Sequence, residues 1–232
     1  SIFGLTYDIE LSTRPEEKYI GSIEIWNKSE KALEEACHRA GHDCKINPGD
    51  GAFYGPKLDF HIKDSLGRVW QCGTIQLDMN LPERFDLTYI SSDGSKKRPV
   101  MLHRVIYGSI ERFIGILIEH YAGAFPLWLS PVQVNIIPVN NELHMNYCNE
   151  IKNLLEENNI RVKVDARDEK LGYKMRESQI KKIPITLIIG DNEVNKKQIS
   201  YRKYGNQETY TCEIDEFISE ISKCLKDKKY NI

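Results

Sequence analysis

The spacing of apolar residues in the first half of the chain predicts an antiparallel sheet with two helices. Residues 22–42 have apolar positions at helical spacing, and strand-like runs follow at residues 51–64, 68–80 and 84–92. Runs joined by such short turns are expected to pair antiparallel. A further apolar helix face at residues 108–121 predicts a helix that lies against this sheet.

The second half alternates strands with helices. The patterns predict strand 132–139, helix 141–157, strand 161–167, helix 171–182, strand 185–190, strands 198–204 and 208–213, and helix 214–228. Alternation of this kind predicts a mostly parallel sheet with right-handed crossovers, here with an antiparallel hairpin at one side.

Two prolines and a glycine within residues 123–131 interrupt both patterns and indicate a boundary between domains. The expected organisation is an antiparallel α+β domain in residues 1–127, a linker at residues 128–131, and an α/β domain in residues 132–232. In the second domain we expect a mixed, mostly parallel five-stranded sheet and three helices.

Composition and charge indicate where the protein acts and what it can bind. No apolar run in the 232 residues approaches the roughly 20 needed to cross a bilayer, and the first residues do not have a targeting pattern. The six cysteines are scattered without a Cys-x-x-Cys pair, which favours free thiols and a cytoplasmic location. Since the net charge is only -2, nucleic-acid binding would require a local basic patch.

Arg112 stands in the first turn of the helix predicted at 108–121, where the helix dipole is unfavourable to a cation. A bound phosphate would explain this placement, because helix N-termini and guanidinium groups both bind phosphate oxygens. The alternative is an exposed arginine paired with Glu111 or Asp78.

Two predicted strands carry polar residues at alternate positions, and these could line one surface of the sheet. The residues are Tyr54, Lys57 and Asp59 on the first strand and Thr74, Gln76 and Asp78 on the next. Gln71 joins that face only if Gly73 lies at a β-bulge. The alternative is an ordinary solvated face.

Histidine and cysteine give weak signals of metal binding. Cys37, His38, His42 and Cys44 have ligand-like spacing at a helix end, although histidine is also common there because of the helix dipole. His103 lies alone on a strand predicted to be buried, where a hydrogen-bonded core histidine is the more frequent arrangement.

Several long collinear blocks together resemble the class II threonyl-tRNA synthetases. These blocks are ELSTRPEEKYIGS, PGDGAFYGPKLDF, WQCGTIQLDMNLPERFDLTY, RPVMLHRVIYGSIERFIGILIEHYAGAFPLWLSPVQV and GDNEV. The resemblance runs from about residue 5 to the end. It implies the last part of a class II catalytic sheet, followed by an anticodon-binding domain.

The resemblance assigns roles to residues of the first domain. HRVIYGSIERF resembles motif 3, whose arginine, here Arg112, grips the ATP phosphates and acts in catalysis together with Lys57. The remaining implied roles are ATP binding by Lys57, Gln71, Thr74 and Arg112, threonine binding by Tyr54 and Gln76, and zinc binding by His103. The other two zinc ligands of the family, a cysteine and a histidine, would lie upstream of residue 1.

The implied activity is that of a threonine–tRNA ligase. Threonine would be adenylated by ATP with Mg²⁺ and then transferred to the terminal ribose of tRNA(Thr). Zn²⁺ with an open coordination position would bind the threonine hydroxyl and reject valine, which an apolar pocket distinguishes by only about 1 to 3 kcal/mol. The family's motif 1, which forms its homodimer interface, and most of motif 2 would precede residue 1, so this chain alone is predicted to be inactive.

The resemblance also implies anticodon contacts in the second domain. The matching residues are Asp168, Glu169, Lys174, Arg176, Glu193 and Arg202, although the family often has asparagine where this chain has Asp168. A phosphate-facing patch could comprise Lys181, Lys182, Lys196, Lys197, Arg202 and Lys203. Two rival functions are a non-catalytic RNA-binding relative and a class II synthetase for another amino acid.

Overall fold

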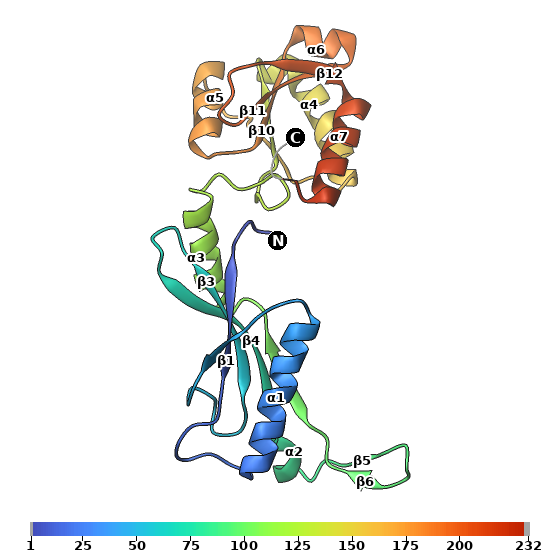
Figure 1. Cartoon of the computed structure of the whole chain (residues 1–232). Helices are drawn as coiled ribbons and strands as arrows, with labels where there is room; N and C mark the ends of the chain where they lie inside the picture. Colours follow the sequence, from blue (N-terminus) through green and yellow to red (C-terminus); the bar gives the residue numbers. More distant parts are fainter. Residues whose placement is uncertain (1, 230–232) are drawn as a thin grey trace. The chain divides into compact units, whose positions relative to one another are not determined.

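The computed structural model describes residues 2–229, which fall into two compact units (Figure 1). Unit 1 comprises residues 1–120 and unit 2 comprises residues 121–232. Each unit has its own five-stranded sheet and its own apolar core.

The sheet of unit 1 has the strand order β2-β1-β3-β4-β7. Its strands are β1 (Tyr7–Ser12), β2 (Lys45–Asn47), β3 (Lys57–Lys63), β4 (Val69–Asp78) and β7 (Met101–Val105). The β1–β2 pair is parallel and the other pairs are antiparallel. The antiparallel arrangement predicted for residues 51–80 is therefore confirmed.

Helix α1 (Ile23–Arg39) covers the apolar face of this sheet (Figure 1). The Ser22 hydroxyl accepts a hydrogen bond from the Ile25 amide and begins the helix. Leu33 and Cys37 pack against Ile9, Leu11 and Leu58, whose side chains leave the strands on the same side. Since side chains alternate along a strand, the polar residues between them lie together on the opposite face.

Helix α3 (Ile110–His120) buries Phe113, Ile116 and Leu117. An ion pair between Glu119 and Arg68, at 3.2 Å, joins it to the start of β4. The helix predicted at residues 108–121 is therefore confirmed.

The third strand predicted in this region, at residues 84–92, is confirmed only at Tyr89–Ile90, and its expected place in the sheet is wrong. Helix α2 (Asn80–Arg84) begins directly after β4, and β5 (Tyr89–Ile90) pairs with β6 (Lys96–Lys97) in a separate hairpin (Figure 1). The cause is Asp78, whose carboxylate accepts hydrogen bonds from the amides of Asn80 and Leu81 and so turns the chain out of the sheet.

The predicted burial of the strand around His103 is also wrong. Strand β7 pairs with β4 alone and forms an edge of the sheet, so most of its side chains are exposed. The side chain of His103 is 43% exposed. Alternation of apolar residues does not distinguish an edge strand from a central one.

Unit 2 contains a mixed five-stranded sheet, as predicted, and its strand order is β12-β11-β10-β8-β9. Its elements are β8 (Val134–Pro138), α4 (Asn141–Glu157), β9 (Val162–Val164), α5 (Leu171–Ile180), β10 (Ile185–Ile189), α6 (Asp191–Lys196), β11 (Gln198–Lys203), β12 (Tyr210–Glu213) and α7 (Ile214–Asp227). Strands β9, β8 and β10 are parallel, and β11 and β12 are antiparallel. Helix α6 was not predicted, because six residues are too few for a helical period to be recognised.

The helices of unit 2 lie on both faces of its sheet (Figure 1). Ile136 and Leu187 form one core with Ile151 of α4 and Phe217 of α7. On the other face, Ser178 of α5 hydrogen-bonds residues of β8 and β10. Within residues 2–229, no helix combines the length and apolar character that a membrane span requires.

Asp64 provides a test of the turn between β3 and β4. Burial raises the pKa of its carboxyl, but hydrogen bonds from Trp70 and Arg68 outweigh this and lower the pKa from 3.8 to about 2. The ionised carboxylate therefore stabilises the fold above about pH 4, and this contribution is lost as the pH falls towards 2. We expect Asp64→Asn to lower the free energy of unfolding at pH 7, with a smaller difference at pH 3. Urea unfolding followed by tryptophan fluorescence measures the free energy at both pH values. A difference between wild type and variant that does not change with pH would contradict the lowered pKa of Asp64.

Candidate functional site

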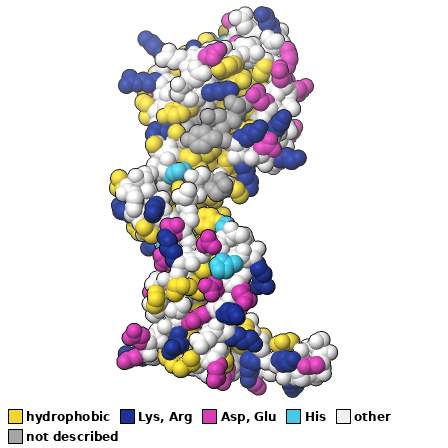
Figure 2. Space-filling view, in the orientation of Figure 1, with side chains coloured by type: hydrophobic (Ala, Val, Ile, Leu, Met, Phe, Trp, Pro, Cys, Tyr) yellow, Lys and Arg dark blue, Asp and Glu magenta, His cyan; other side chains and the backbone are white. Residues whose placement is uncertain are grey.

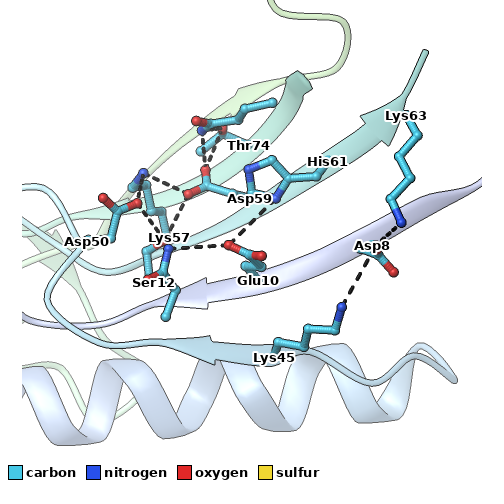
Figure 3. Close-up of polar contacts among 12 residues, drawn as sticks. Asp8, Glu10, Ser12, Lys45, Asp50, Lys57, Asp59, His61, Lys63 and Thr74 are labelled. Carbon is cyan, nitrogen blue, oxygen red and sulfur yellow. Dashed lines mark hydrogen bonds and ion pairs between the residues drawn. The ribbon is translucent and has the colours of Figure 1, made fainter. Parts of the chain in front are cut away.

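The polar face of the unit 1 sheet is organised around the carboxylate of Asp59, which is 1% exposed. Its Oδ2 accepts hydrogen bonds from Ser12 Oγ at 2.9 Å and from Lys57 Nζ at 2.7 Å. Its Oδ1 accepts from Thr74 Oγ1 at 2.9 Å and from the amide nitrogen of Gln71. Figure 3 shows the carboxylate between Ser12, Lys57 and Thr74, which come from β1, β3 and β4.

A β-bulge in β4 brings Gln71 to this face. Asp59 pairs with Thr74, but the register then shifts, and His61 pairs with Gln71 instead of Cys72. The extra residue reverses the alternation of side chains at this point. The bulge expected near Gly73 is therefore confirmed, and it places Lys57, Gln71 and Thr74 around one carboxylate.

Lys57 is held in its charged form. Burial lowers the pKa of its ammonium group, but the hydrogen bonds and charges of Asp59 and Asp50 outweigh this effect and raise the pKa above its ordinary value of 10.5. Asp50 Oδ2 lies 3.3 Å from Lys57 Nζ. The Lys57 ammonium is thus fixed between two carboxylates on a partly exposed surface (Figure 3).

A second cluster lies next to this one along β4. The hydroxyl of Tyr54 donates a 3.0 Å hydrogen bond to Gln76 Oε1. Gln76 pairs with His103 across the β4–β7 ladder, and the rings of Tyr54 and His103 meet edge to face at 6.4 Å. The structure thus brings together Tyr54, Gln76 and His103, the residues expected to bind threonine and zinc.

Gly55 makes the contact between Tyr54 and Gln76 possible. A Cβ atom at this position would collide with the backbone carbonyl of Leu77 on β4. Only glycine allows the chain before β3 to approach β4 this closely.

Asp78 orients His103. One carboxylate oxygen lies 2.8 Å from His103 Nε2, and the other accepts the two amides at the start of α2. Burial raises the pKa of Asp78, but the hydrogen bonds from His103 and from these amides lower it below its ordinary value. Because Nε2 is engaged, Nδ1 of His103 is the nitrogen suited to a metal, in the carboxylate–histidine arrangement common at zinc sites.

Arg112 is exposed and lies over the ring of Trp70, with 5.2 Å between the guanidinium carbon and the ring centroid. Among residues 2–229, no carboxylate forms an ion pair with it. Glu111 instead accepts from Ser109, and Asp78 is bound to His103, so the predicted alternative of an ion-paired Arg112 is wrong. Within the residues that the structure describes, no hydrogen bond joins its guanidinium to Lys57, Gln71 or Gln76.

The cluster at the end of α1 does not form a metal site. In the described part of the chain, no three histidine, cysteine or acidic side chains are grouped as metal ligands. Burial and the neighbouring Cys37 raise the pKa of the Cys44 thiol to about 11, which disfavours the thiolate that binds metals.

In unit 2, two of the predicted anticodon residues line one pocket. Arg176 of α5 and Arg202 of β11 enclose a cavity of about 440 Å³ together with Gln179 and Asn206. Guanidinium and amide groups can stack on bases and hydrogen-bond to their edges. This pocket is therefore a candidate for contact with a base.

The other predicted anticodon residues occupy different environments. Asp168 and Glu169 are exposed on the loop after β9. The Glu193 carboxylate accepts hydrogen bonds from the Gly190 amide at 2.9 Å and from Ser200 Oγ at 2.7 Å, so it caps α6. Lys174 is 2% exposed, which places it inside the unit instead of on the surface that a base would contact.

Asn141 is a residue of this region that the sequence did not single out. It stands at the start of α4, and its Oδ1 accepts a hydrogen bond from Lys174 Nζ at 3.2 Å. Its Nδ2 donates to the carbonyls of Ala166 at 2.8 Å and Arg167 at 3.3 Å. Asn141 thus fixes the loop that carries Asp168, although nothing in its sequence context marks it.

The predicted basic patch is interspersed with acidic groups. Lys181 pairs with Glu177, Lys197 pairs with Glu150, and the Lys182 ammonium bonds the Ala122 carbonyl. Figure 2 shows side chains of both signs mixed on the visible face of unit 2. Electrostatic attraction of RNA would therefore depend on a few residues, such as the two arginines of the pocket.

Comparison with known proteins places this geometry in a family. The model of the tRNA synthetase class II core domain (G, H, P, S and T) matches residues 3–121, and the model of the anticodon binding domain matches residues 133–224. The chain therefore belongs to the class II tRNA synthetase family defined by this core domain.

Within that family, the similar curated proteins are threonine–tRNA ligases. The chain is 62% identical over 221 residues to the enzyme of Fusobacterium nucleatum subsp. nucleatum, and 54% identical over 228 residues to that of Acetivibrio thermocellus. These alignments cover 95% and 98% of the chain but 35% and 36% of the relatives. The chain thus spans about a third of the length of the curated relatives it matches.

Solved structures agree with this assignment. The RNA binding domain of threonyl-tRNA synthetase from Cryptosporidium parvum Iowa II matches with a TM-score of 0.87 and 38% identity, over 95% of this chain and 56% of that one. Prolyl-tRNA synthetase from Cryptosporidium parvum matches with a TM-score of 0.57 and 26% identity, over 75% of this chain and 39% of that one.

The contacts of Asn141 predict a local effect on the loop of Asp168. We expect Asn141→Ala to accelerate backbone hydrogen exchange in residues 166–170, because the loop loses the amide that binds two of its carbonyls. Asn158→Ala is the matched control, since Asn158 lies at the other end of α4 and bonds only the Leu154 carbonyl of its own helix. Equal exchange rates in this loop for both variants would show that Asn141 does not hold it.

Proposed function

We propose that the chain is part of a threonine–tRNA ligase, in which unit 1 contributes to amino-acid activation and unit 2 binds tRNA(Thr) at its anticodon. The domain limits proposed are residues 1–127 for the catalytic part, 128–131 for the linker and 132–232 for the anticodon-binding part. The observation that carries the proposal is the grouping of Tyr54, Gln76 and His103 beside the Asp59 cluster on one polar sheet face.

In the proposed reaction, the carboxylate of threonine attacks the α-phosphorus of ATP. Pyrophosphate leaves and threonyl-adenylate forms, and a hydroxyl of the terminal ribose of the tRNA then attacks the acyl carbon and releases AMP. Lys57, Gln71 and Thr74 would bind ATP, and Arg112 would neutralise phosphate charge. Their contribution is orientation and charge stabilisation, with Mg²⁺ expected as the phosphate counterion.

Zinc fits the proposed threonine site through His103. The imidazole side chain is 43% exposed, and a buried carboxylate orients it at Nε2, as expected of one ligand whose companions come from another part of the protein. When bound, zinc would supply a Lewis acid that distinguishes threonine from valine by its hydroxyl. Tyr54 and Gln76 would orient the amino acid beside it.

Unit 2 would read single-stranded anticodon bases with Arg176, Arg202, Asp168 and Glu169. Lys174 and Glu193 would support that surface from inside. A homodimeric parent protein acting in the cytoplasm is part of the same proposal. The rival function, that of a non-catalytic RNA-binding relative, is less favoured. Such a relative would be expected to have lost the polar residues of the catalytic unit, whereas here they are present and hydrogen-bonded around Asp59 and Asp78.

Threonine dependence tests the proposed activity. The full-length protein that contains this chain is expected to exchange labelled pyrophosphate into ATP in the presence of threonine and far more slowly with valine, which lacks the second donor atom. Glycine, histidine, proline and serine are the informative comparisons, because the family model spans enzymes for these amino acids. Exchange driven by one of them, with none for threonine, would contradict the proposal.

The arginine pocket of unit 2 tests the anticodon assignment. Each of Arg176→Ala and Arg202→Ala is expected to weaken binding of a tRNA(Thr) transcript by about tenfold in the full-length protein, and to leave exchange with threonine unchanged. Lys223→Ala is the charge-matched control, because Lys223 is exposed on α7 and does not line the pocket. Filter binding at several salt concentrations gives the affinities. Identical losses for all three variants would indicate general electrostatics instead of a base contact.

A further inference from the structure

We propose that Asp59 is a positioning residue for ATP, which fixes the three side chains expected to surround the nucleotide. This inference rests on the proposed function and extends it to a residue that cannot touch the ligand itself. Asp59 is 1% exposed, and each of its two oxygens accepts two donors.

The first argument is the arrangement of donors. Lys57, Gln71 and Thr74 come from two strands, and in the described part of the chain this carboxylate is the one partner that all three share. A buried charge of this kind is stable only when it is paired and hydrogen-bonded, so the carboxylate and its donors fix one another. Three long or rotatable side chains are thereby held in one conformation each before any ligand arrives.

The second argument is the orientation of the Gln71 amide. A carboxylate accepts hydrogen bonds and cannot donate, so the amide nitrogen of Gln71 must face Asp59. This nitrogen also lies 3.0 Å from Thr74 Oγ1. The amide oxygen is consequently directed away from Asp59, where it can accept from a donor on the nucleotide.

The third argument distinguishes Asp59 from the threonine cluster. Tyr54 and Gln76 bond each other, and neither bonds Asp59. Loss of the carboxylate should therefore weaken ATP binding more than threonine binding. A residue with a merely structural role would weaken both.

Asp59→Asn in the full-length protein tests the role directly. Asparagine keeps the shape but turns an NH₂ group towards two donors, whichever way the amide is placed. We expect the Kd for ATP, measured by calorimetry, to rise about tenfold or more, and the Kd for threonine to change less than about twofold. Asp165→Asn is the matched control, because Asp165 is also buried and also paired with a cation, Arg167, but lies in unit 2. It is expected to leave both constants unchanged.

Ser12→Ala keeps the test decisive if Asp59→Asn does not fold. Ser12 is 0% exposed and cannot reach a nucleotide, so any change in ATP affinity must be transmitted through the carboxylates that its hydroxyl contacts, Asp59 at 2.9 Å and Asp50 at 3.4 Å. We expect a loss of about threefold to tenfold for ATP, and none for Ser178→Ala, a buried serine of unit 2. Unchanged ATP affinity in both Asp59→Asn and Ser12→Ala overturns the inference.

The outcome is separable from that of the proposed function. A wild-type protein that binds ATP but activates a different amino acid would overturn the threonine assignment. The effect of Asp59→Asn on the Kd for ATP could still be measured in that protein. A wild-type protein that activates threonine, with variants of normal ATP affinity, would overturn the role of Asp59 alone.

Discussion

The buried carboxylate of Asp59 is the interaction on which the polar face of unit 1 depends. An ionised carboxyl group in the interior is destabilising unless its lone pairs are occupied, and here four donors from three strands occupy them. Two of those donors, Gln71 and Thr74, are three residues apart on one strand, which would place them on opposite faces of a regular β4. The bulge at Cys72 removes this conflict. A local irregularity of the backbone is thus what allows the charge to be buried.

Asp78 couples two features that look unrelated in the sequence. One of its oxygens turns the chain into α2, and the other holds His103. Capping the helix therefore fixes the carboxylate, and the fixed carboxylate sets which imidazole nitrogen is available. The same residue that removed residues 84–92 from the sheet also orients the expected metal ligand.

The sequence predicts most of the elements because their signals are local. The amphipathic helix at residues 22–42, the strands beside Asp59, and the alternation in residues 132–228 follow from apolar spacing. Parity showed only that Gln71 would need a bulge near Gly73 to join the polar face, and did not show that the bulge exists. Local sequence patterns do not show which helix or strand lies beside each element. The apolar residues of β7 predicted a strand but not its position at the edge of the sheet. The residues around Lys174 did not predict that its side chain is buried against Asn141. The roles of the individual site residues and the exact domain limits stay predictions.

The two units place their candidate side chains on different kinds of support. In unit 1, Lys57 and Thr74 are held by the buried carboxylate of Asp59, and Gln76 is held by Tyr54. Lys57, Thr74 and Gln76 stand on paired strands, which suits the proposed role of groups that would orient a substrate within fractions of an ångström. In unit 2, Asp168 and Glu169 stand on an exposed loop, and Arg202 lies next to the turn of a hairpin. Single-stranded bases can be splayed to meet such groups, so less rigidity is needed there. The loop is nevertheless tied to α4 by one amide side chain, that of Asn141, which limits its freedom without burying the groups that would face RNA. The side chains proposed for chemistry therefore stand on paired strands, whereas those proposed for recognition are divided between a tethered loop, helix α5 and strand β11.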